Sequence, residues 1–321
     1  MTDTPKFKVA VLTLCYNTGG FVDQAITSLV EQSYYSEKIN SIQHLILDDA
    51  SSDNSVQIIK DRLKKCKHNY TFIENEVNKG ISNSFDALFK LIDAEYYCFL
   101  SDDLWNPIFL TSNINLLDSL DNDVGVVYSD VQEIDENNSI ISTSFFQKYN
   151  ICATPSGNAY EQNIAKNFIP AISSMVRYKC AVSVGGYDIN LPTEDVDFWL
   201  RLLREFKCHY NSKNLVSYRR HNKSVTISAK YDLAEFKLIT YNKHWGQNSK
   251  IDKLLLKKSK RIIIYSLYKN HKSKMGLLWL DRYAKSTNTI DVHFLRLLYK
   301  TSVPLFVIKL YLRLILKLSK T

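Results

Sequence analysis

The chain has 321 residues, of which 45% are hydrophobic and 23% are charged, an ordinary globular composition with room for a large α/β domain and an appendage. Its six cysteines form no Cys-x-x-Cys pair, which argues against a disulfide framework or a zinc site and fits reduced thiols in a cytosol. The net charge of +8 is uneven: residues 251–321 hold 16 Lys and Arg against 3 Asp and Glu, or +13, and the remainder therefore carries −5.

The N-terminal end is polar from Met1 to Lys8 and then enters an apolar run, so we expect no signal peptide. No stretch reaches the roughly 18 uncharged apolar residues of a membrane-spanning helix. The strongly basic C-terminal end instead predicts an anionic partner, either membrane lipid or nucleic acid.

The first hundred residues alternate between apolar runs and segments with helical spacing. The runs that predict strands are residues 8–16, 42–47, 70–73 and 96–100. The segments that predict helices are residues 21–32, 53–65 and 81–92. Strands separated by helices of this length predict a parallel sheet with right-handed crossovers.

Adjacent acids follow two of these strands, as Asp48-Asp49 and Asp102-Asp103. The carboxyl ends of parallel strands meet at the sheet edge where ligands bind, and Mg²⁺ takes one or two carboxylates together with substrate phosphates. Asp102 and Asp103 therefore predict a metal–diphosphate site. The alternative is that Asp102 caps a helix starting near Pro107, or begins a turn.

The turn at Tyr16-Asn17 follows the first strand and faces the same edge. An aromatic ring there can stack on a nucleobase, and an acid after the second strand can accept hydrogen bonds from a base or a ribose. The alternatives are core filling for Tyr16 and turn or capping chemistry for Asp48 and Asp53. The chain contains neither G-x-G-x-x-G nor a Gly-Lys-Ser/Thr phosphate loop, so it shows no dinucleotide fingerprint.

The next segments are less regular. They predict a strand over residues 124–129, a hairpin or excursion over 135–149, a strand over 169–177 and a last strand over 215–219.

A glycine hinge at residues 185–186 precedes a predicted helix with Thr193 as its N-cap. The acids Glu194, Asp195 and Asp197 suit the positive end of the helix dipole, which is a complete structural explanation of them. The functional interpretation is that Asp195 points into the cleft as a general base.

Five segments in this order resemble family 2 glycosyltransferases: VLTLCYN (11–17), DDASSD (48–53), NKGIS (78–82), LSDDLW (100–105) and GGY…EDVDFWLR (185–201). The resemblance covers residues 6–225. It implies the A-type transferase fold, an α/β architecture with a Rossmann-like, mostly parallel sheet flanked by helices. It also implies an inverting enzyme that uses a nucleoside-diphosphate sugar, most often a UDP-sugar.

The resemblance assigns site residues to three roles. The residues that bind the nucleotide are Tyr16, Asn17, Asp49, Gly80 and Asp102. A Mn²⁺ or Mg²⁺ ion is held by Asp103 as the main ligand and by His221, although a lone histidine after a strand is more often a surface or structural residue. Asp195 takes the proton of the acceptor hydroxyl.

Three positions depart from the family pattern. The first acid of the commoner acidic motif is missing, and Ser101-Asp102-Asp103 resembles the variant with two adjacent acids; Leu14 stands where threonine is frequent, and Asp86 where asparagine is frequent. One carboxylate fewer weakens metal affinity. The Gln-x-x-Arg-Trp element of processive polymerases is absent, so we expect addition of one sugar, of the kind that builds bacterial surface polysaccharides.

We expect two domains: a transferase domain over residues 1–228 and a helical basic extension over 229–321. Residues 302–318 are rich in Leu, Ile and Val, and Lys309, Arg313 and Lys317 lie on one helical stripe. This pattern predicts a helix in a membrane interface, which would place the enzyme in the cytoplasm, peripheral on the inner face of the cell membrane, with a saccharide or lipid-linked acceptor. The alternative is a helix packed on the transferase domain or on a second copy of the chain.

Two other functions compete with this interpretation. A glycoside hydrolase also needs two carboxylates, but it needs no nucleotide. A degenerate transferase domain could instead act as a membrane- or nucleic-acid-binding protein through its basic end, because fold alone does not fix function. For the transferase we expect no nucleic acid partner.

Overall fold

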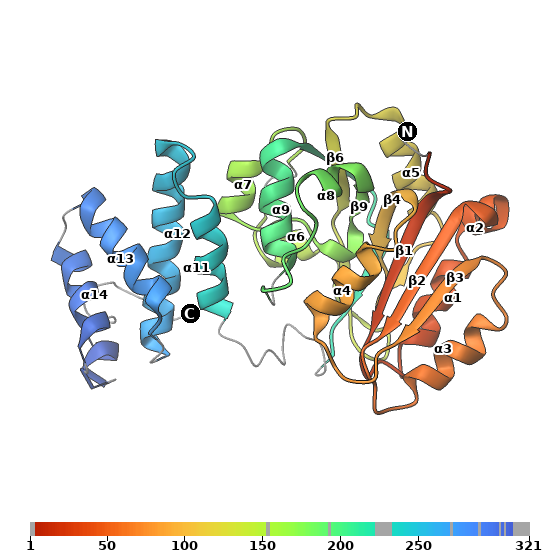
Figure 1. The fold of residues 1–321 in the computed structure, drawn as a ribbon, viewed down its shortest axis with the longest axis horizontal. Helices are drawn as coiled ribbons and strands as arrows, with labels where there is room; N and C mark the ends of the chain where they lie inside the picture. The colour runs from red at the N-terminus through yellow and green to blue at the C-terminus, as the bar shows by residue number, and fades with distance from the viewer. Residues whose placement is uncertain are drawn as a thin grey trace. The chain divides into compact units, whose positions relative to one another are not determined.

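The computed structural model describes residues 4–151, 155–191, 194–221, 233–269, 272–287, 290–301, 303–304 and 306–310. The chain divides into two compact units, Met1–Ser228 and Ala229–Thr321. In Figure 1 the first unit runs from red to green and the second from cyan to blue.

The first unit is built around a seven-stranded sheet with the order β10-β6-β9-β4-β1-β2-β3. Its strands are β1 (Phe7–Cys15), β2 (Ile42–Asp48), β3 (Asn69–Glu74), β4 (Ala94–Phe99), β6 (Val124–Ser129), β9 (Met175–Arg177) and β10 (Lys207–Asn211). The strands β4, β1, β2 and β3 are parallel neighbours, while β9 is antiparallel to β4 and β6. The predicted α/β class with a mostly parallel sheet is therefore confirmed.

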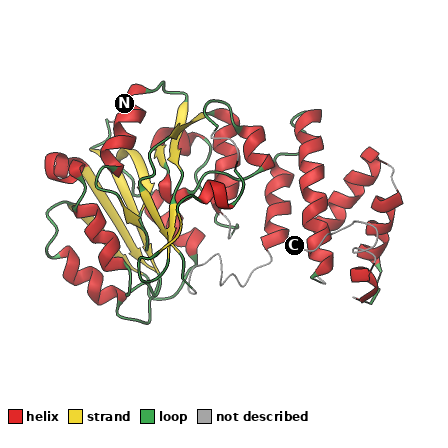
Figure 2. Cartoon of the chain, turned by 180° about the vertical axis from the view of Figure 1, so that it is seen from behind, coloured by secondary structure: helices red, strands yellow, loops and turns green. Residues whose placement is uncertain are grey.

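Helices cover both faces of this sheet (Figure 2). Those whose side chains pack on one face are α1 (Val22–Val30), α2 (Ser33–Lys38), α3 (Ser55–Leu63) and α5 (Phe109–Ser119). Those on the other face are α4 (Ile81–Phe89), α6 (Phe145–Lys148), α7 (Tyr160–Ala165), α8 (Tyr178–Ser183) and α9 (Glu194–Glu205). The two layers bury the sheet on both sides.

This two-sided burial explains why the first strand is a continuous apolar run. Val9 and Val11 pack toward α1, whereas Ala10 and Leu12 pack toward α4. Successive side chains of a strand point to opposite faces, so a strand covered on both faces needs apolar residues at every position.

A second, four-stranded sheet brings distant segments to the end of β4. Its order is β5-β11-β7-β8, with the strands β5 (Leu104–Trp105), β11 (Val216–Arg219), β7 (Gln132–Ile134) and β8 (Ile140–Ser142). Because β11 pairs with β5, the chain around residue 219 lies beside the chain around residues 102–103.

The second unit consists of helices in its described part. They are α11 (Leu233–Lys243), α12 (Ser249–Tyr268), α13 (Lys274–Thr287) and α14 (Ile290–Lys300). Trp279 is fully buried, and its indole N–H donates to the Leu238 carbonyl over 3.1 Å. Arg282 lies over the rings of Trp245 and Trp279, which ties α13 to the segment between α11 and α12.

Three local expectations need correction or fall outside the described residues. Residues 169–177 are not one strand, because a 3-10 helix (Ala171–Ser173) precedes the short β9. The strand β10 was not predicted. The N-cap of α3 is Asn54, although Asp53 accepts the first N–H of that helix over 2.9 Å. Thr193 lies outside the described residues.

The predicted helix over residues 302–318 lies mostly outside the described residues too; of its described residues, 306–310 are helical and 303–304 are not. Within the part of the chain that the structure describes, no helix has the length and apolar character needed to span a membrane. Of the six cysteines, the five described ones are free thiols, as expected: Cys15, Cys66, Cys98, Cys180 and Cys208.

Candidate active site

Loops that follow β1 and β2 are joined to each other at the carboxyl edge of the sheet. Cys15 and Asp48 are paired at the strand ends, and Asn17 then adopts a left-handed φ of 55°. In this conformation its backbone N–H donates to Ser51 Oγ over 2.8 Å, and its Oδ1 accepts from the Ser52 N–H over 2.8 Å. The side chain of Tyr16 is 51% exposed at this junction. Core filling is therefore the wrong interpretation for Tyr16.

The first acid pair is buried and its hydrogen bonds are made within the chain. Asp48 accepts from both the N–H and the hydroxyl of Ser51. Asp49 Oδ1 accepts from the Lys79 N–H over 2.9 Å and from the Asn75 amide over 2.8 Å, and its Oδ2 accepts from the Gly80 N–H over 2.9 Å. Asp49 thus fixes the turn that starts α4.

Gly80 is suited to this turn by its backbone. It has a φ of 82° just before α4, a backbone conformation that residues other than glycine rarely adopt. In the first turn of α4, Ser82 Oγ donates to the Leu191 carbonyl over 2.6 Å. The start of α4 is thereby tied to the segment that leads toward Asp195.

In the second acid pair, Asp102 is the accessible member. Its Oδ2 is paired with His221 Nε2, and the two side chains are 17% and 6% exposed. The imidazole lies 4.8 Å from the ring of Phe21, measured between centroids. Asp102 therefore does not cap the following helix, whose N-cap is Ile108.

Asp103 is the buried member of this pair, with only 1% of its surface exposed. Its Oδ1 accepts from the backbone N–H of Arg219 over 2.9 Å. Burial and the charge of Asp102 raise the pKa of the Asp103 carboxyl well above its usual range, and the hydrogen bond and charge of Arg219 oppose that rise. The residue expected to be the main metal ligand is thus the less accessible of the two acids.

Arg219 organises this corner, a role that was not predicted from the sequence. Its guanidinium is fully buried and donates to the Asp102 carbonyl over 2.8 Å, to Asn138 Oδ1 over 2.7 Å and to Gln24 Oε1 over 3.0 Å. The same group lies 4.8 Å from the centroid of the Phe21 ring. Burial lowers the pKa of Arg219. The only signal in the sequence is a basic residue that directly ends an apolar strand.

Asp195 lies in the first turn of α9, where its Oδ1 accepts from the next backbone N–H over 2.7 Å. The loop before this helix is held by Arg201, which donates to the Val184 carbonyl over 2.5 Å and to the Gly186 carbonyl over 2.7 Å. Arg201 is itself bound to the buried Asp197 over 2.8 Å. The glycine hinge and the helix that carries Asp195 therefore form one rigid element.

The donor set at the second acid pair fits a divalent metal. It offers a carboxylate oxygen of Asp102 and an imidazole nitrogen of His221 at one place, and Mn²⁺ accepts such ligands. Among the described residues no cluster of three or more His, Cys, Asp or Glu could hold a metal. Other ligands would then come from the substrate and water, which is the usual arrangement for Mg²⁺ and substrate phosphates.

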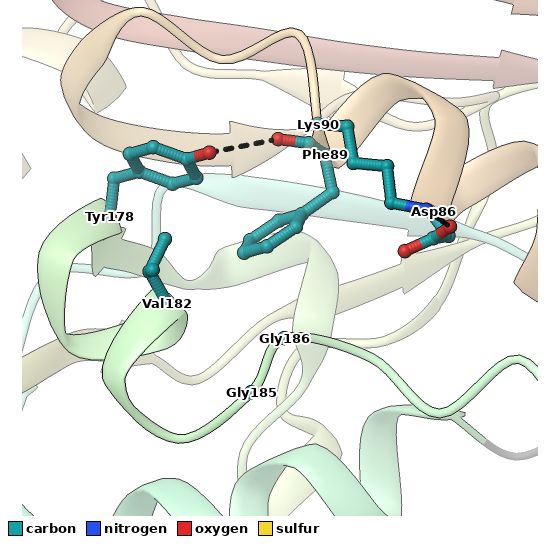
Figure 3. A pocket seen from close by; sticks show the side chains of 7 residues that line it. All are labelled: Asp86, Phe89, Lys90, Tyr178, Val182, Gly185 and Gly186. Atoms are coloured by element: carbon teal, nitrogen blue, oxygen red, sulfur yellow. Dashed lines mark hydrogen bonds and ion pairs between the residues drawn. The ribbon is translucent and has the colours of Figure 1, made fainter.

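A pocket elsewhere on the first unit contains none of the residues that the sequence assigns to the site (Figure 3). Asp86 and Lys90 form an ion pair at its rim over 2.7 Å, and the Tyr178 hydroxyl donates to the Phe89 carbonyl over 3.3 Å. Gly186 also lines this pocket. The polar groups of this pocket bind one another, so the better candidate for the active site is the acidic edge of the sheet.

Comparisons with known proteins identify the family of the chain. The family model described as "Glycosyl transferase family 2" matches residues 10–180, which is more than half of the chain, and the chain therefore belongs to glycosyl transferase family 2. An "Uncharacterized glycosyltransferase" of Rickettsia felis is 24% identical over 222 residues. This match covers 67% of the chain but only 34% of that relative, so the chain spans about a third of its length.

Solved structures share the fold. Residues over 90% of the chain superpose on 84% of Staphylococcus aureus TarS 1-349, crystallised with UDP-GlcNAc, with a TM-score of 0.67 and 16% identity. The mannosyltransferase PcManGT of Pyrobaculum calidifontis, in complex with GDP-Man and Mn²⁺, gives a TM-score of 0.57 and 13% identity over 97% of the chain and 87% of that protein. The A-type transferase fold expected from the sequence is confirmed.

Proposed function

We propose that the chain is an inverting glycosyltransferase that moves one sugar from a nucleoside-diphosphate sugar to a hydroxyl of a saccharide or lipid-linked saccharide. The observation that carries the proposal is the Asp102–His221 pair, whose carboxylate is partly exposed, located at the sheet edge where the loops after β1 and β2 also meet. The catalytic residues all fall within residues 1–228, which we propose as the transferase domain.

For the donor we propose UDP as the nucleotide. The exposed ring of Tyr16 would stack on the base, with Asn17 and Gly80 forming the walls of the site. Asp49 would accept a hydrogen bond from the base while it continues to hold the turn at Gly80, because a carboxylate oxygen can accept two bonds. The crystal complex of TarS with UDP-GlcNAc supports this choice of donor class.

Mn²⁺ or Mg²⁺ would be held by Asp102 and His221, with Asp103 behind them as a further ligand. A bound metal ion supplies positive charge that stabilises the departing diphosphate. The Asp–His donor set favours Mn²⁺ over Mg²⁺, and the PcManGT complex with Mn²⁺ supports that choice.

In the transfer step, Asp195 accepts the proton of the acceptor hydroxyl. The hydroxyl oxygen forms a bond to the anomeric carbon as the bond from that carbon to the diphosphate oxygen breaks on the opposite face, which inverts the anomer. General-base catalysis contributes about 10²- to 10⁴-fold, so Asp195→Asn should lower kcat by that factor and leave UDP affinity unchanged. A wild-type turnover rate for Asp195→Asn would remove this assignment.

Calorimetric titration with UDP tests the proposal directly. We expect Mn²⁺ to increase UDP affinity, and Asp102→Asn to lower the metal-dependent affinity at least about tenfold. Asp61→Asn is the matched control, because Asp61 is an exposed acid on α3. If neither UDP nor another nucleoside diphosphate binds with or without metal, the transferase proposal is wrong. Hydrolysis of a glycoside without nucleotide would favour the hydrolase.

We also propose that the enzyme acts in the cytoplasm at the inner face of the cell membrane, where a lipid-linked acceptor of a surface polysaccharide would be found. The support is the charge of +13 over residues 251–321, which would attract an anionic surface.

A further inference from the structure

The long helix of the second unit exposes a line of cations. Lys253, Lys257 and Arg261 are exposed at successive positions four apart on α12, and the next position in this line is Tyr265, whose side chain is 60% exposed. Residues four apart lie on one face of a helix. These four residues, called the α12 stripe below, form a row of positive charges that ends in an aromatic ring.

The acids of this unit are engaged elsewhere. Lys260 pairs with Asp291, and Arg296 pairs with Asp281. Asp252 accepts from the backbone N–H of Gly246 over 2.8 Å. In these contacts, three of the four acids that follow residue 232 are bound to partners outside the α12 stripe.

Exposed apolar side chains lie next to the end of this helix. Phe306 is 72% exposed and Leu310 is 55% exposed, and the two are one helical turn apart. Lys309 in the same turn lies 5.1 Å from the centroid of the Tyr268 ring, near the end of α12. The unit therefore presents cations and large apolar groups on neighbouring segments.

We propose that the α12 stripe together with Phe306 and Leu310 is a docking surface for an anionic lipid bilayer. A bilayer surface satisfies both features, because its headgroups attract the cations and its interface accepts exposed aromatic and aliphatic groups. A nucleic acid would satisfy the cations but would leave Leu310 and Phe306 without an apolar partner. The inference rests on the proposed function only in one respect: a lipid-linked acceptor would give the enzyme a reason to bind a bilayer.

Vesicle co-sedimentation of the full chain tests the proposal. We expect binding to phosphatidylcholine vesicles that contain phosphatidylglycerol and weak binding to phosphatidylcholine alone, with binding reduced by salt. The double variant Lys257→Glu with Arg261→Glu should lower partitioning at least about tenfold, since each cation near the surface contributes about 1 kcal/mol. The double variant Phe306→Ser with Leu310→Ser should weaken the binding that remains at high salt.

The matched control is Lys64→Glu with Lys90→Glu, which makes the same change of net charge at two exposed positions of the first unit. This control should keep vesicle binding. The proposal is overturned if the control loses as much binding as the stripe variant, if phosphatidylglycerol makes no difference, or if duplex DNA binds more tightly than the vesicles. It is also overturned if Phe306→Ser with Leu310→Ser abolishes self-association of the chain while vesicle binding is unchanged.

UDP titration without vesicles separates this proposal from the proposed function. Normal UDP binding by a chain that does not bind vesicles would overturn the lipid surface alone. Vesicle binding by a chain that binds no nucleotide would overturn the transferase proposal alone.

Discussion

Two pairs of adjacent acids follow parallel strands of the same sheet, yet the fold uses them differently. Asp48 and Asp49 are buried and accept hydrogen bonds from Ser51 and from the turn at Gly80. Asp102 instead pairs with His221, which follows β11 and is more than a hundred residues away in the chain. A carboxylate whose partners are backbone N–H groups holds a loop, whereas one that meets a histidine at an accessible edge is available to a ligand.

The second pair also differs within itself. Asp102 is accessible and Asp103 is not, and Arg219 lies behind both, with its backbone bound to Asp103 and its guanidinium bound to the carbonyl of Asp102. A buried guanidinium is costly unless it is fully hydrogen-bonded. The second pair is therefore held by a buried cation, Arg219, whereas the first pair is held by neutral hydrogen-bond donors.

Replacing Arg219 should have the largest effect. Removing one member of a buried charge network costs about 3–5 kcal/mol, so we expect Arg219→Ala to lower the free energy of unfolding by that amount, as measured by urea denaturation. Arg219→Lys keeps the charge but loses the fork that reaches Asn138 and Gln24 together. It should fold and lose most of the Mn²⁺-dependent UDP affinity.

The control for this prediction is Arg220→Lys. Arg220 binds the buried Glu133, which Lys148 also binds, so a lysine there should leave metal-dependent UDP binding intact. If both lysine variants bind UDP and Mn²⁺ like the wild type, the guanidinium of Arg219 is not needed for metal-dependent UDP binding.

Asp49→Asn and Asp102→Asn should have different effects on stability and on UDP binding. Asp49→Asn removes the charge that two backbone N–H groups donate to, and such hydrogen bonds contribute about 1.5–3 kcal/mol each, so we expect a loss of about 3 kcal/mol of unfolding free energy. Asp102→Asn should cost less, because the Asp102 side chain is 17% exposed and is bound to one side chain rather than to two backbone N–H groups, but it should abolish the effect of Mn²⁺ on UDP binding. Equal losses of stability in the two variants would show that Asp49 does not stabilise the fold more than Asp102 does.

The sequence was sufficient for the architecture because that depends on local patterns. Apolar runs bounded by turns gave the parallel strands β1 to β4, and their order along the chain brought Tyr16, Asn17, Asp49 and Asp102 to one edge. The short β9 and β10 were misjudged, because an antiparallel insertion and an edge strand depend on pairing with segments far away in the chain.

The inside of the site could not be predicted for the same reason. Whether Asp102 or Asp103 is accessible depends on how β11 pairs with β5, and nothing near residue 102 encodes that contact. The role of Arg219 likewise depends on Gln24 and Asn138, which are 195 and 81 positions away. A family resemblance assigns residues to roles, but it does not give their burial.

Acid should weaken the part of the sheet beside the first acid pair. On β2, His44 hydrogen-bonds Thr13 and His68, and His68 also bonds Tyr35. Burial and the charge of His68 hold the pKa of His44 well below its usual value, and burial lowers the pKa of His68 to about 4.

The unfolded chain, with a histidine pKa of about 6.5, takes up these protons first as the pH falls. The contribution of these histidines to stability should therefore be constant above that value, fall between about pH 6.5 and 4, and be about 2 kcal/mol lower at pH 5 from His68 alone. Urea denaturation of the wild type and of His68→Gln over this range measures the difference. Parallel curves for the two proteins would show that His68 is not held neutral.

Asp103→Asn should have the smallest effect and the opposite sign. Because burial and Asp102 raise the pKa of Asp103, ionising this carboxyl at pH 7 costs folding free energy, and that cost grows as the pH rises through the window above the unfolded value of about 3.9. Asparagine keeps the acceptor for the Arg219 N–H without the charge. In the absence of divalent metal we expect the variant to be more stable than the wild type at pH 7, as measured by urea denaturation. Mn²⁺ with UDP should stabilise the wild type more than the variant, so the difference between the two melting temperatures should shrink on adding them. A variant that is less stable than the wild type without metal would mean that Arg219 fully compensates the Asp103 charge, and that the two acids differ in access alone.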